Sequence, residues 1–328
     1  MDILVQPLNR TIRVAPGANL LEALLGAQVP MSYSCLSGRC GTCRCRVLEG
    51  EVLDGQGAEQ RPLDSRDTEV LACQTFLTES CTIRVPEPDE VVVHPARIIK
   101  ATVAALEDLT HDIKRLVLRP AKPLAFSPGQ YLQLQFGEGL SRPYSMAGLC
   151  DDALMEFHVR VVPGGRVSGH IAEALRVGDS VKVSGPLGSA YLRRRHTGPV
   201  LCVAGGTGLA PILSILRGMD HEGLDNEVHL YLGVRSPRDL YGLDWLQALQ
   251  ARRPRLRVHP VVASGGDPAQ HRSGLVTQAI EADWADLSGW RAYLCGSPPM
   301  VEAASQLVRQ RGLPAEHIYA DAFYPQSA

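Results

Sequence analysis

The pattern of apolar and polar positions changes twice along this chain of 328 residues, and it divides the chain into three segments. Short strands surround one helical stretch in the first segment, apolar positions alternate with polar ones in the second, and apolar strands alternate with helical patterns in the third. We therefore expect units at residues 1–88, 95–197 and 198–328. The stretch Pro86-Glu-Pro-Asp-Glu90 suits a linker after the first unit.

The first segment predicts a small α+β fold. A hairpin is expected over residues 3–14, and Asn19 can cap a helix over residues 20–28, with Glu22 as its capping-box partner. A cysteine-rich loop follows this helix. Further strands are expected at residues 44–48, 69–73 and 82–85.

The second segment predicts an antiparallel β-barrel. Apolar side chains alternate with polar ones over short runs, as in strands that bury one face. Turn signals such as Ser127-Pro-Gly-Gln130 and Gly185-Pro-Leu-Gly188 separate the runs. The expected strands are residues 98–104, 114–118, 131–135, 155–162 and 180–184.

The third segment predicts a doubly wound α/β unit with a parallel sheet, because uniformly apolar strands alternate with helical patterns. The expected strands are residues 200–204, 228–233, 257–262 and 291–295. The expected helices are residues 210–219, 240–250, 275–281 and 300–311.

Charge and hydropathy exclude several classes of function. The formal net charge is −2 and the pI is about 6.6, which argues against binding to nucleic acid or to an anionic membrane. The N-terminus lacks the basic and apolar regions of a signal peptide, and no apolar run approaches the roughly 20 residues of a membrane helix. We therefore expect a soluble, cytoplasmic protein.

The nine cysteines change this picture most, because several of them cluster. Cys35, Cys40 and Cys43 form a C-x₄-C-x₂-C pattern, and Cys73 lies downstream on a predicted strand; this is the spacing of a plant-type [2Fe–2S] ligand set. Gly38 and Gly41 would let backbone N–H groups approach the sulfides. Zinc is the alternative, but zinc sites favour two paired C-x₂-C knuckles, and this chain has one.

Three side chains near this motif have simpler interpretations as well. Cys45 is expected to point to the opposite face of its strand from a residue one position away, and to serve in packing. Arg39 and Arg44 either raise the potential of a cluster or meet an acidic partner; the alternative is that they are solvated loop charges.

Two motifs in the second segment indicate a flavin. Arg142-Pro-Tyr-Ser145 ends a predicted strand and offers a cation for phosphate, a ring for stacking and a hydroxyl for a ring nitrogen. Gly164-Gly-Arg-Val-Ser168 opens a helical pattern, whose first N–H groups can bind an anion. Two elements directed at phosphate suggest FAD, although Gly164 and Gly165 are also compatible with a simple hairpin turn.

The third segment carries features of a nicotinamide site. Gly205-Gly-Thr-Gly-Leu-Ala-Pro211 follows an apolar strand and opens a helix, where a pyrophosphate docks in nucleotide-binding folds. Arg235 follows the second strand and could accept a 2′-phosphate, so NADPH is expected to be usable beside NADH; the alternative is a surface arginine. Cys295, next to Gly296, could touch the nicotinamide or be a small buried hydrophobe. Phe323 could cover the flavin or belong to a terminal core strand.

In this order the motifs resemble the ferredoxin–NADP reductase superfamily with a fused plant-type ferredoxin. Four stretches make the resemblance narrower, to the reductase components of naphthalene-dioxygenase-type aromatic-ring-hydroxylating systems. These are Ser32-Tyr-Ser-Cys-Leu-Ser-Gly-Arg-Cys-Gly-Thr-Cys-Arg-Cys-Arg46, His94-Pro-Ala-Arg-Ile-Ile-Lys100, Pro186-Leu-Gly188 and Ile318-Tyr-Ala-Asp-Ala-Phe-Tyr-Pro325.

The resemblance implies a multidomain chain: an α+β β-grasp ferredoxin domain, an antiparallel β-barrel flavin domain and an α/β doubly wound nucleotide-binding domain. Relatives often carry glutamate where Asp321 stands. The cluster ligands would be Cys35, Cys40, Cys43 and Cys73. The residues assigned to FAD and the nicotinamide cofactor are Arg142, Pro143, Tyr144, Ser145, His158, Val159, Arg160, Gly165, Arg166, Val167, Ser168, Gly206, Thr207, Gly208, Arg235, Cys295, Gly296 and Phe323.

The expected function is an electron relay. NAD(P)H would give a hydride to FAD, FAD would pass single electrons to the [2Fe–2S] cluster, and the cluster would reduce a separate Rieske-type ferredoxin that feeds a terminal oxygenase. No acid–base dyad is required, so His158 and His170 are expected to be structural. A reductase that feeds an oxygenase directly and a redox sensor are the alternatives.

Overall fold

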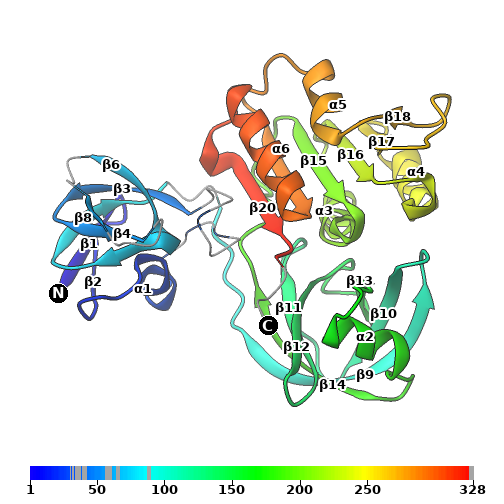
Figure 1. Cartoon of the computed structure of the whole chain (residues 1–328), viewed down its shortest axis with the longest axis horizontal. Coiled ribbons are helices and arrows are strands. Elements are labelled where there is room, and N and C mark those ends of the chain that lie inside the picture. The colour runs from blue at the N-terminus through cyan, green and yellow to red at the C-terminus, as the bar shows by residue number, and fades with distance from the viewer. Residues whose placement is uncertain are drawn as a thin grey trace.

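The N-terminal part forms two small sheets and one helix in the computed structural model (Figure 1). The structure describes residues 1–29, 31, 33, 38, 43–55, 61–63, 67–86 and 90–324, with backbone alone at 61 and 63. The elements are β1 (Asp2–Gln6), β2 (Arg10–Arg13), α1 (Leu20–Gly26), β3 (Arg44–Glu49), β4 (Val52–Asp54), β5 (Arg61–Leu63), β6 (Thr68–Leu71), β7 (Thr75–Leu77) and β8 (Cys81–Arg84). The strand orders are β2-β1-β8-β3-β6 and β5-β4-β7.

The predicted hairpin and helix of this part are confirmed. The side chain of Asn19 accepts a hydrogen bond from the Glu22 amide at 3.2 Å, which satisfies one of the unpaired N–H groups at the start of α1. The helix ends two residues before the predicted position. The strands β4, β5 and β7 escaped prediction because three residues are too few to show a period.

One strand prediction was wrong at its end. Strand β6 stops at Leu71, and the residues Ala72–Gln74 form a 3₁₀ turn, so Cys73 does not lie on a strand. Hydrogen bonds from outside the segment bend the chain here: the Ala72 amide donates to the Cys43 carbonyl at 2.9 Å, and the Asn19 side chain donates to the Cys73 carbonyl at 3.0 Å.

The middle part is an antiparallel barrel, as predicted. Its elements are β9 (Arg97–Asp108), β10 (Ile113–Pro120), β11 (Tyr131–Gly137), β12 (Leu140–Ser145), β13 (Met155–Arg160), α2 (Arg166–Glu173) and β14 (Ser180–Leu187). The strand order is β12-β11-β14-β9-β10-β13. A bridge between Met146 and Phe157 joins the two edge strands, so the sheet closes upon itself around an apolar core.

The C-terminal part is a doubly wound parallel sheet, also as predicted. Its strands are β15 (Val200–Gly205), β16 (Val228–Val234), β17 (Leu256–Val262), β18 (Arg272–Ser273), β19 (Arg291–Gly296) and β20 (Ile318–Ala322). Its helices are α3 (Leu209–His221), α4 (Leu243–Arg252), α5 (Val276–Asp283) and α6 (Pro298–Gln310). The strand order is β18-β17-β16-β15-β19-β20, and every pair is parallel.

Side chains of β15 alternate between two cores, one on each face of the parallel sheet. Cys202 packs with α3 and α4, whereas Val203 packs with α5 and α6. Because the strand order diverges on either side of β15, the carboxyl end of this strand is the expected place for a ligand.

The barrel contacts each of the other two parts of the chain. In Figure 1 the barrel lies beneath the parallel sheet, and the N-terminal part lies to one side of both. The Ser214 hydroxyl on α3 donates to the Gly148 carbonyl beyond β12 at 2.6 Å, and the Tyr33 amide donates to the Ser189 hydroxyl at 3.1 Å. Within the described ranges, no helix is long and apolar enough to cross a bilayer.

Candidate functional site

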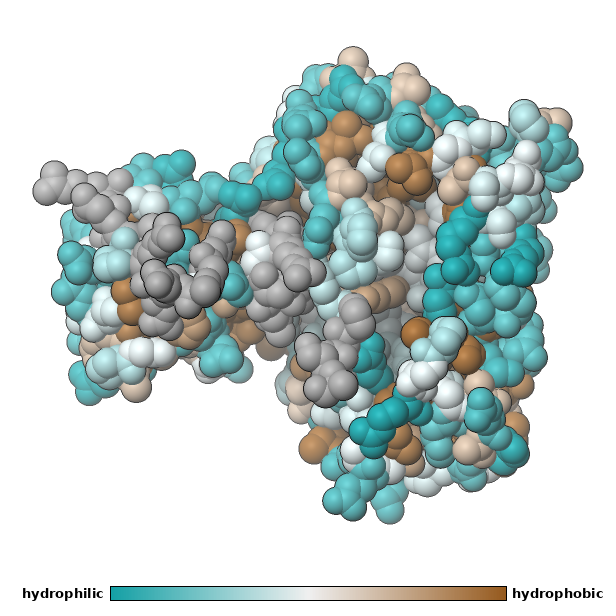
Figure 2. Space-filling model, viewed as in Figure 1, coloured by the Kyte–Doolittle hydropathy of each residue, from teal (hydrophilic) through white to brown (hydrophobic). Residues whose placement is uncertain are grey.

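A cavity of about 1190 Å³ brings all three parts of the chain together. In Figure 2 the surface is hollowed between the barrel and the parallel sheet. Tyr33 lines the cavity from the N-terminal part, Tyr144 from the barrel and Thr207 from the parallel sheet. The predicted site residues that line it are Arg142, Pro143, Tyr144, Ser145, His158, Arg160, Gly165, Arg166, Val167, Ser168, Gly206, Thr207, Arg235 and Phe323.

Four predicted site residues do not line the cavity. Val159 has no exposed surface and belongs to the core of the barrel. Cys295 is likewise fully buried, packed with α3, and burial raises its thiol pKa well above the usual value. The structure thus places Cys295 as a small buried hydrophobe. Gly208, in the 3₁₀ turn after β15, and Gly296, at the end of β19, instead allow close backbone contacts; a Cβ on Gly296 would lie 2.8 Å from the Gly205 carbonyl oxygen.

Two glycines of the turn after β15 leave little room for a side chain. Gly206 has φ +55°, and a Cβ there would lie 2.7 Å from Nη2 of Arg160. A Cβ on Gly208 would lie 2.1 Å from the Cys295 carbonyl oxygen. This glycine-rich turn precedes α3 at the carboxyl end of the sheet, and the guanidinium of Arg160 lies against it. This arrangement fits the pyrophosphate of a nicotinamide dinucleotide.

The barrel supplies the second half of the cavity from β12 and α2. Arg142 donates to the Tyr324 carbonyl at 3.4 Å, and burial raises the pKa of Tyr144 to about 12, so its ring presents a neutral phenol. Gly164, at φ +72°, turns the chain into α2, so this glycine pair is both a turn and a helix start. The Ser168 hydroxyl accepts from the Val162 amide at 3.1 Å, which fixes that turn. These groups fit a flavin dinucleotide.

Asp321 on β20 reaches the barrel side of the cavity. The Ser145 hydroxyl donates to its Oδ2 at 2.8 Å. Burial raises the pKa of Asp321 to about 6, and the hydrogen bond from Ser145 opposes this rise in part. The pair can therefore hold a proton beside the cavity near neutral pH.

His158 is a structural group, buried where the barrel meets the parallel sheet. Its Nε2 lies 3.2 Å from Glu156 Oε1 and its Nδ1 lies 3.0 Å from the Tyr241 hydroxyl, which in turn donates to the Gly206 carbonyl at 3.2 Å. Burial lowers the pKa of His158. Burial also opposes ionisation of Glu156, but hydrogen bonds from His158 and Arg115 outweigh it and hold that pKa at about 2. Sequence reasoning missed Tyr241, because no motif surrounds it.

His170 lies away from this network, on α2. Its ring centroid is 6.0 Å from that of Phe136.

The described part of the cysteine motif fits a cluster held in a tight loop. Cys43 and Cys73 are both buried, and the Ala72 amide bonded to the Cys43 carbonyl draws their segments together. Gly38 has φ +76°, and a Cβ there would lie 2.7 Å from Cγ of Gln74. The predicted ligands Cys35 and Cys40, with Arg39 and Gly41, lie outside the described residues, as do linker residues 87–89.

Cys45 packs in the core, as expected. Its side chain is 3% exposed and shares the buried face of β3 with Val47, and burial raises its thiol pKa. Arg44 is neither unpaired nor fully solvated, because it forms an ion pair with Glu69 on β6.

Tyr33 is a further residue that motif reasoning did not single out. Its amide donates to the Ser189 hydroxyl at 3.1 Å, and that hydroxyl donates to the Tyr33 carbonyl at 3.3 Å. Its phenol bonds to Tyr131 of β11, and burial together with this neighbour raises the pKa of Tyr131. In the sequence, Tyr33 precedes the predicted ligand Cys35 by two positions. The N-terminal part is thereby fixed at the cavity wall.

We expect Asp321→Asn to change how stability depends on pH. The folded pKa of about 6 exceeds the usual 3.8, so the folded state binds this proton more tightly and the wild type loses stability as pH rises from about 4 to about 6. Relative to Asp321→Asn, the wild type should lose about 2 kcal/mol of unfolding free energy between about pH 4.5 and about pH 8, measured by urea denaturation. Asp225→Asn, at an exposed carboxyl, is the control and should follow the wild type. Parallel profiles for Asp321→Asn and the wild type would contradict the assignment.

Comparison with known proteins identifies the families of all three parts. Residues 3–78 match the 2Fe-2S iron-sulfur cluster binding domain, residues 100–191 the oxidoreductase FAD-binding domain, and residues 202–306 the oxidoreductase NAD-binding domain. Each match falls on one of the three folds described above, so the cluster, FAD and nicotinamide chemistry expected from the motifs is confirmed at the level of the family.

Similarity to whole proteins extends over the full chain. The chain is 57% identical over 325 residues to the ferredoxin–NAD(P)+ reductase component of the naphthalene 1,2-dioxygenase/salicylate 5-hydroxylase systems of Ralstonia sp., and 58% identical over 326 residues to that of the naphthalene 1,2-dioxygenase system of Pseudomonas putida, covering 99% of each chain. The crystal structure of an Amycolatopsis cytochrome P450 reductase covers 99% of both chains, with a TM-score of 0.74 and 37% identity. This chain therefore belongs to the family of ferredoxin–NAD(P)+ reductase components of naphthalene-dioxygenase-type systems, and it is an NAD(P)H-dependent oxidoreductase with a [2Fe–2S] cluster and FAD.

Proposed function

We propose that this chain carries electrons from NADH, and also from NADPH, to a separate Rieske-type ferredoxin that serves an aromatic-ring dioxygenase. Its relatives in Ralstonia and Pseudomonas putida are named as ferredoxin–NAD(P)+ reductase components of naphthalene dioxygenase systems. The observation that carries the proposal is the shared cavity, which Tyr33, Tyr144 and Thr207 line from three different folds.

Bound FAD would supply hydride acceptance and release of two electrons one at a time, which is the chemistry a one-electron iron–sulfur acceptor requires. The residues of this chain then have separate tasks. Thr207 and the bare Gly206 turn hold the nucleotide, and Arg160 above them balances its pyrophosphate charge. Tyr144 and Ser145 orient the flavin ring. Phe323 lines the same cavity, between two residues that contact Arg142 and Ser145. Asp321 and Ser145 hold a proton at the buried edge.

We also propose that the functional units run over 1–88, 95–197 and 198–328. The cluster is held by Cys35, Cys40, Cys43 and Cys73 in the first of them. Arg142, Gly165 and Ser168 bind FAD in the second.

The proposed function is tested by reconstitution with a purified Rieske-type ferredoxin. With NADH and a catalytic amount of this chain, the visible spectrum of that ferredoxin should bleach, and omission of the chain should abolish the bleaching. A ferredoxin that stays oxidised while the terminal oxygenase is reduced directly would favour the alternative, a two-component reductase. Negligible turnover with any acceptor, cytochrome c included, would favour a sensor.

We expect Ser189→Ala to weaken electron transfer out of the flavin. The substitution removes both hydrogen bonds that hold the backbone of Tyr33 at the barrel. NADH oxidation with ferricyanide, a small acceptor that can reach the flavin, should stay unchanged, whereas cytochrome c reduction through the cluster should fall about 3- to 10-fold, since a loosened contact costs orientation.

Ser80→Ala is the matched control for this prediction. Ser80 accepts one hydrogen bond, from the Asp2 amide at 3.0 Å, within the N-terminal part and away from the joint with the barrel. Its variant should keep both activities. Equal losses with both acceptors in Ser189→Ala would mean that the serine supports the flavin site rather than the exit of electrons.

A further inference from the structure

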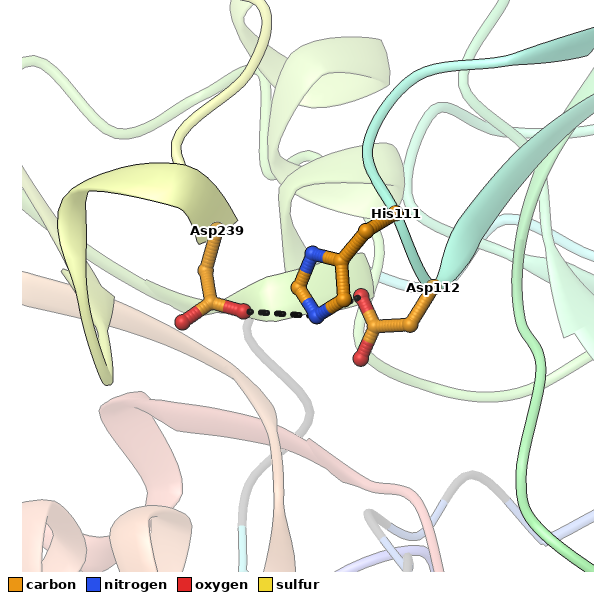
Figure 3. A group of neighbouring side chains, drawn as sticks. All are labelled: His111, Asp112 and Asp239. Atoms are coloured by element: carbon orange, nitrogen blue, oxygen red, sulfur yellow. Dashed lines mark ion pairs between the residues drawn. The ribbon is translucent and has the colours of Figure 1, made fainter.

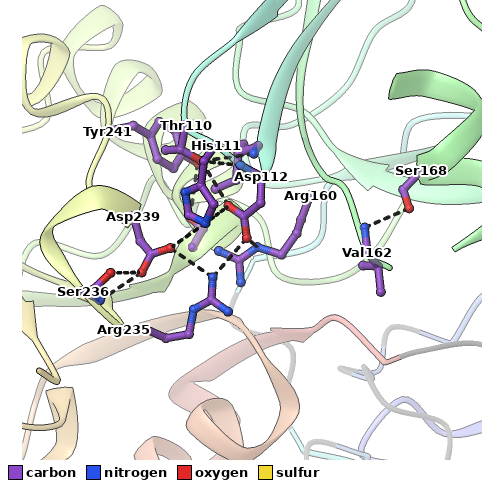
Figure 4. A network of polar contacts seen from close by, with 12 residues as sticks. Thr110, His111, Asp112, Arg160, Val162, Ser168, Arg235, Ser236, Asp239 and Tyr241 are labelled. Atoms are coloured by element: carbon purple, nitrogen blue, oxygen red, sulfur yellow. Dashed lines mark hydrogen bonds and ion pairs between the residues drawn. The ribbon is translucent and has the colours of Figure 1, made fainter. Parts of the chain in front are cut away.

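A cluster of charged residues joins the barrel to the parallel sheet at the edge of the cavity. We call it the Arg235 cluster; its members are His111, Asp112, Arg160, Arg235 and Asp239. Figure 4 shows that the turn between β9 and β10 supplies the first two of these, whereas Arg235 and Asp239 follow β16. Nη2 of Arg235 donates to Asp112 Oδ2 and to Asp239 Oδ1, each at 3.0 Å.

Both carboxylates are held in place by their own neighbours. The Thr110 hydroxyl accepts from the amide of Asp112 at 3.3 Å and donates to its Oδ1 at 3.1 Å. The amide and hydroxyl of Ser236 donate to Asp239 Oδ2 at 2.9 and 2.8 Å. Burial disfavours ionisation of Asp239, but the bonds from Ser236 and Arg235 outweigh it and hold its pKa below the usual value. The two anions are therefore preorganised around Arg235.

The same cluster contains three groups of the kind that bind metals, but we do not regard it as a metal site. Figure 3 shows the side chains of His111, Asp112 and Asp239 converging. Their possible ligand atoms all lie within 4.8 Å of one another. Their charge is already balanced, because Arg235 contacts both carboxylates and Arg160 Nε lies 3.5 Å from Asp112 Oδ2. A divalent ion at this place would have to displace two guanidinium groups.

The position of Arg235 makes the cluster relevant to the choice of nucleotide. Arg235 comes directly after the second strand of the parallel sheet and lines the cavity. At this position, nucleotide-binding folds distinguish a ribose 2′-hydroxyl from a 2′-phosphate. A 2′-phosphate would therefore compete with Asp112 for the guanidinium, and it would also approach the negative charge of Asp112.

We propose that Asp112, a residue of the flavin-binding barrel, is a specificity-determining residue that disfavours NADPH by neutralising Arg235. The inference rests on the proposed placement of the nucleotide across Gly206 and Arg235. Asp239 lies on the same segment as Arg235 and orients its side chain through their hydrogen bond. Asp112 acts from the other fold, so nucleotide preference depends on how closely the barrel approaches the parallel sheet.

The size of the effect follows from exposure. The Arg235 side chain is 65% exposed, so water screens its ion pairs. We expect removal of the Asp112 charge to strengthen binding of a 2′-phosphorylated nucleotide about 3- to 10-fold more than binding of a nucleotide with a free 2′-hydroxyl.

The experiment compares 2′,5′-ADP with 5′-AMP by titration calorimetry on the holoprotein. Asp112→Asn should tighten 2′,5′-ADP clearly more than 5′-AMP, which reports any effect of the released Arg160 on the 5′-phosphate that both ligands share. Asp108→Asn is the matched control: it lies at the end of β9, its ion pair with Lys114 is exposed, and it should alter neither ligand. In steady state, Asp112→Asn should also raise the ratio of kcat/KM for NADPH over that for NADH by a similar factor.

A double variant identifies the arginine that is responsible. Asp112 also contacts Arg160, so its substitution releases two guanidinium groups. If Arg235 carries the effect, Arg235→Gln should abolish the gain produced by Asp112→Asn. A gain that persists in the Arg235→Gln background, or an unchanged ratio in Asp112→Asn, would overturn the inference while leaving the nucleotide site intact. Failure of both ligands to bind would overturn the proposed nucleotide site itself, together with the inference.

Discussion

The bare glycine turn at Gly206 fixes the barrel to the parallel sheet, and the geometry of the cavity depends on this contact. Arg160 of the barrel lies so close that a Cβ on Gly206 would come within 2.7 Å of its guanidinium. The Gly206 carbonyl accepts from Tyr241, whose hydroxyl meets the buried His158 of β13. A side chain at Gly206 would be strained at φ +55° and would displace the Arg160 guanidinium from the turn, which would disturb the contact between the two folds. Hydride transfer between two bound rings tolerates little change in their alignment.

The joint between the N-terminal part and the barrel is of a different kind. The two reciprocal hydrogen bonds between Ser189 and Tyr33 are only partly buried, and each contributes on the order of 1 kcal/mol. The barrel and parallel sheet are instead joined through buried groups, His158 among them. The two sites where a hydride must be aligned thus have the firmer joint, whereas the place where single electrons leave has a lighter one.

The sequence was informative where the signal is local. Apolar periodicity and glycine spacing predicted the three folds, the Gly206 turn and the start of α2, because each depends on neighbouring residues. Contacts between distant residues escaped prediction: Ser189 and Tyr33 are 156 positions apart, and Arg235 and Asp112 are 123 apart. The prediction that Cys73 lies on a strand failed for the same reason. Its segment is bent by hydrogen bonds to residues far away in the sequence, the side chain of Asn19 and the carbonyl of Cys43.

In the proposed relay, electrons pass through the flavin before they reach a cluster held by Cys73. Its most direct test is an anaerobic titration with NADH, followed by visible absorbance and EPR, on a pair of buried-cysteine variants. Cys45→Ala removes a packing thiol and should keep both flavin bleaching and the reduced [2Fe–2S] signal of the wild type. Cys73→Ser should still bleach its flavin but give no reduced-cluster signal. An intact cluster signal in Cys73→Ser, or a cluster that reduces while the flavin stays oxidised, would contradict the account.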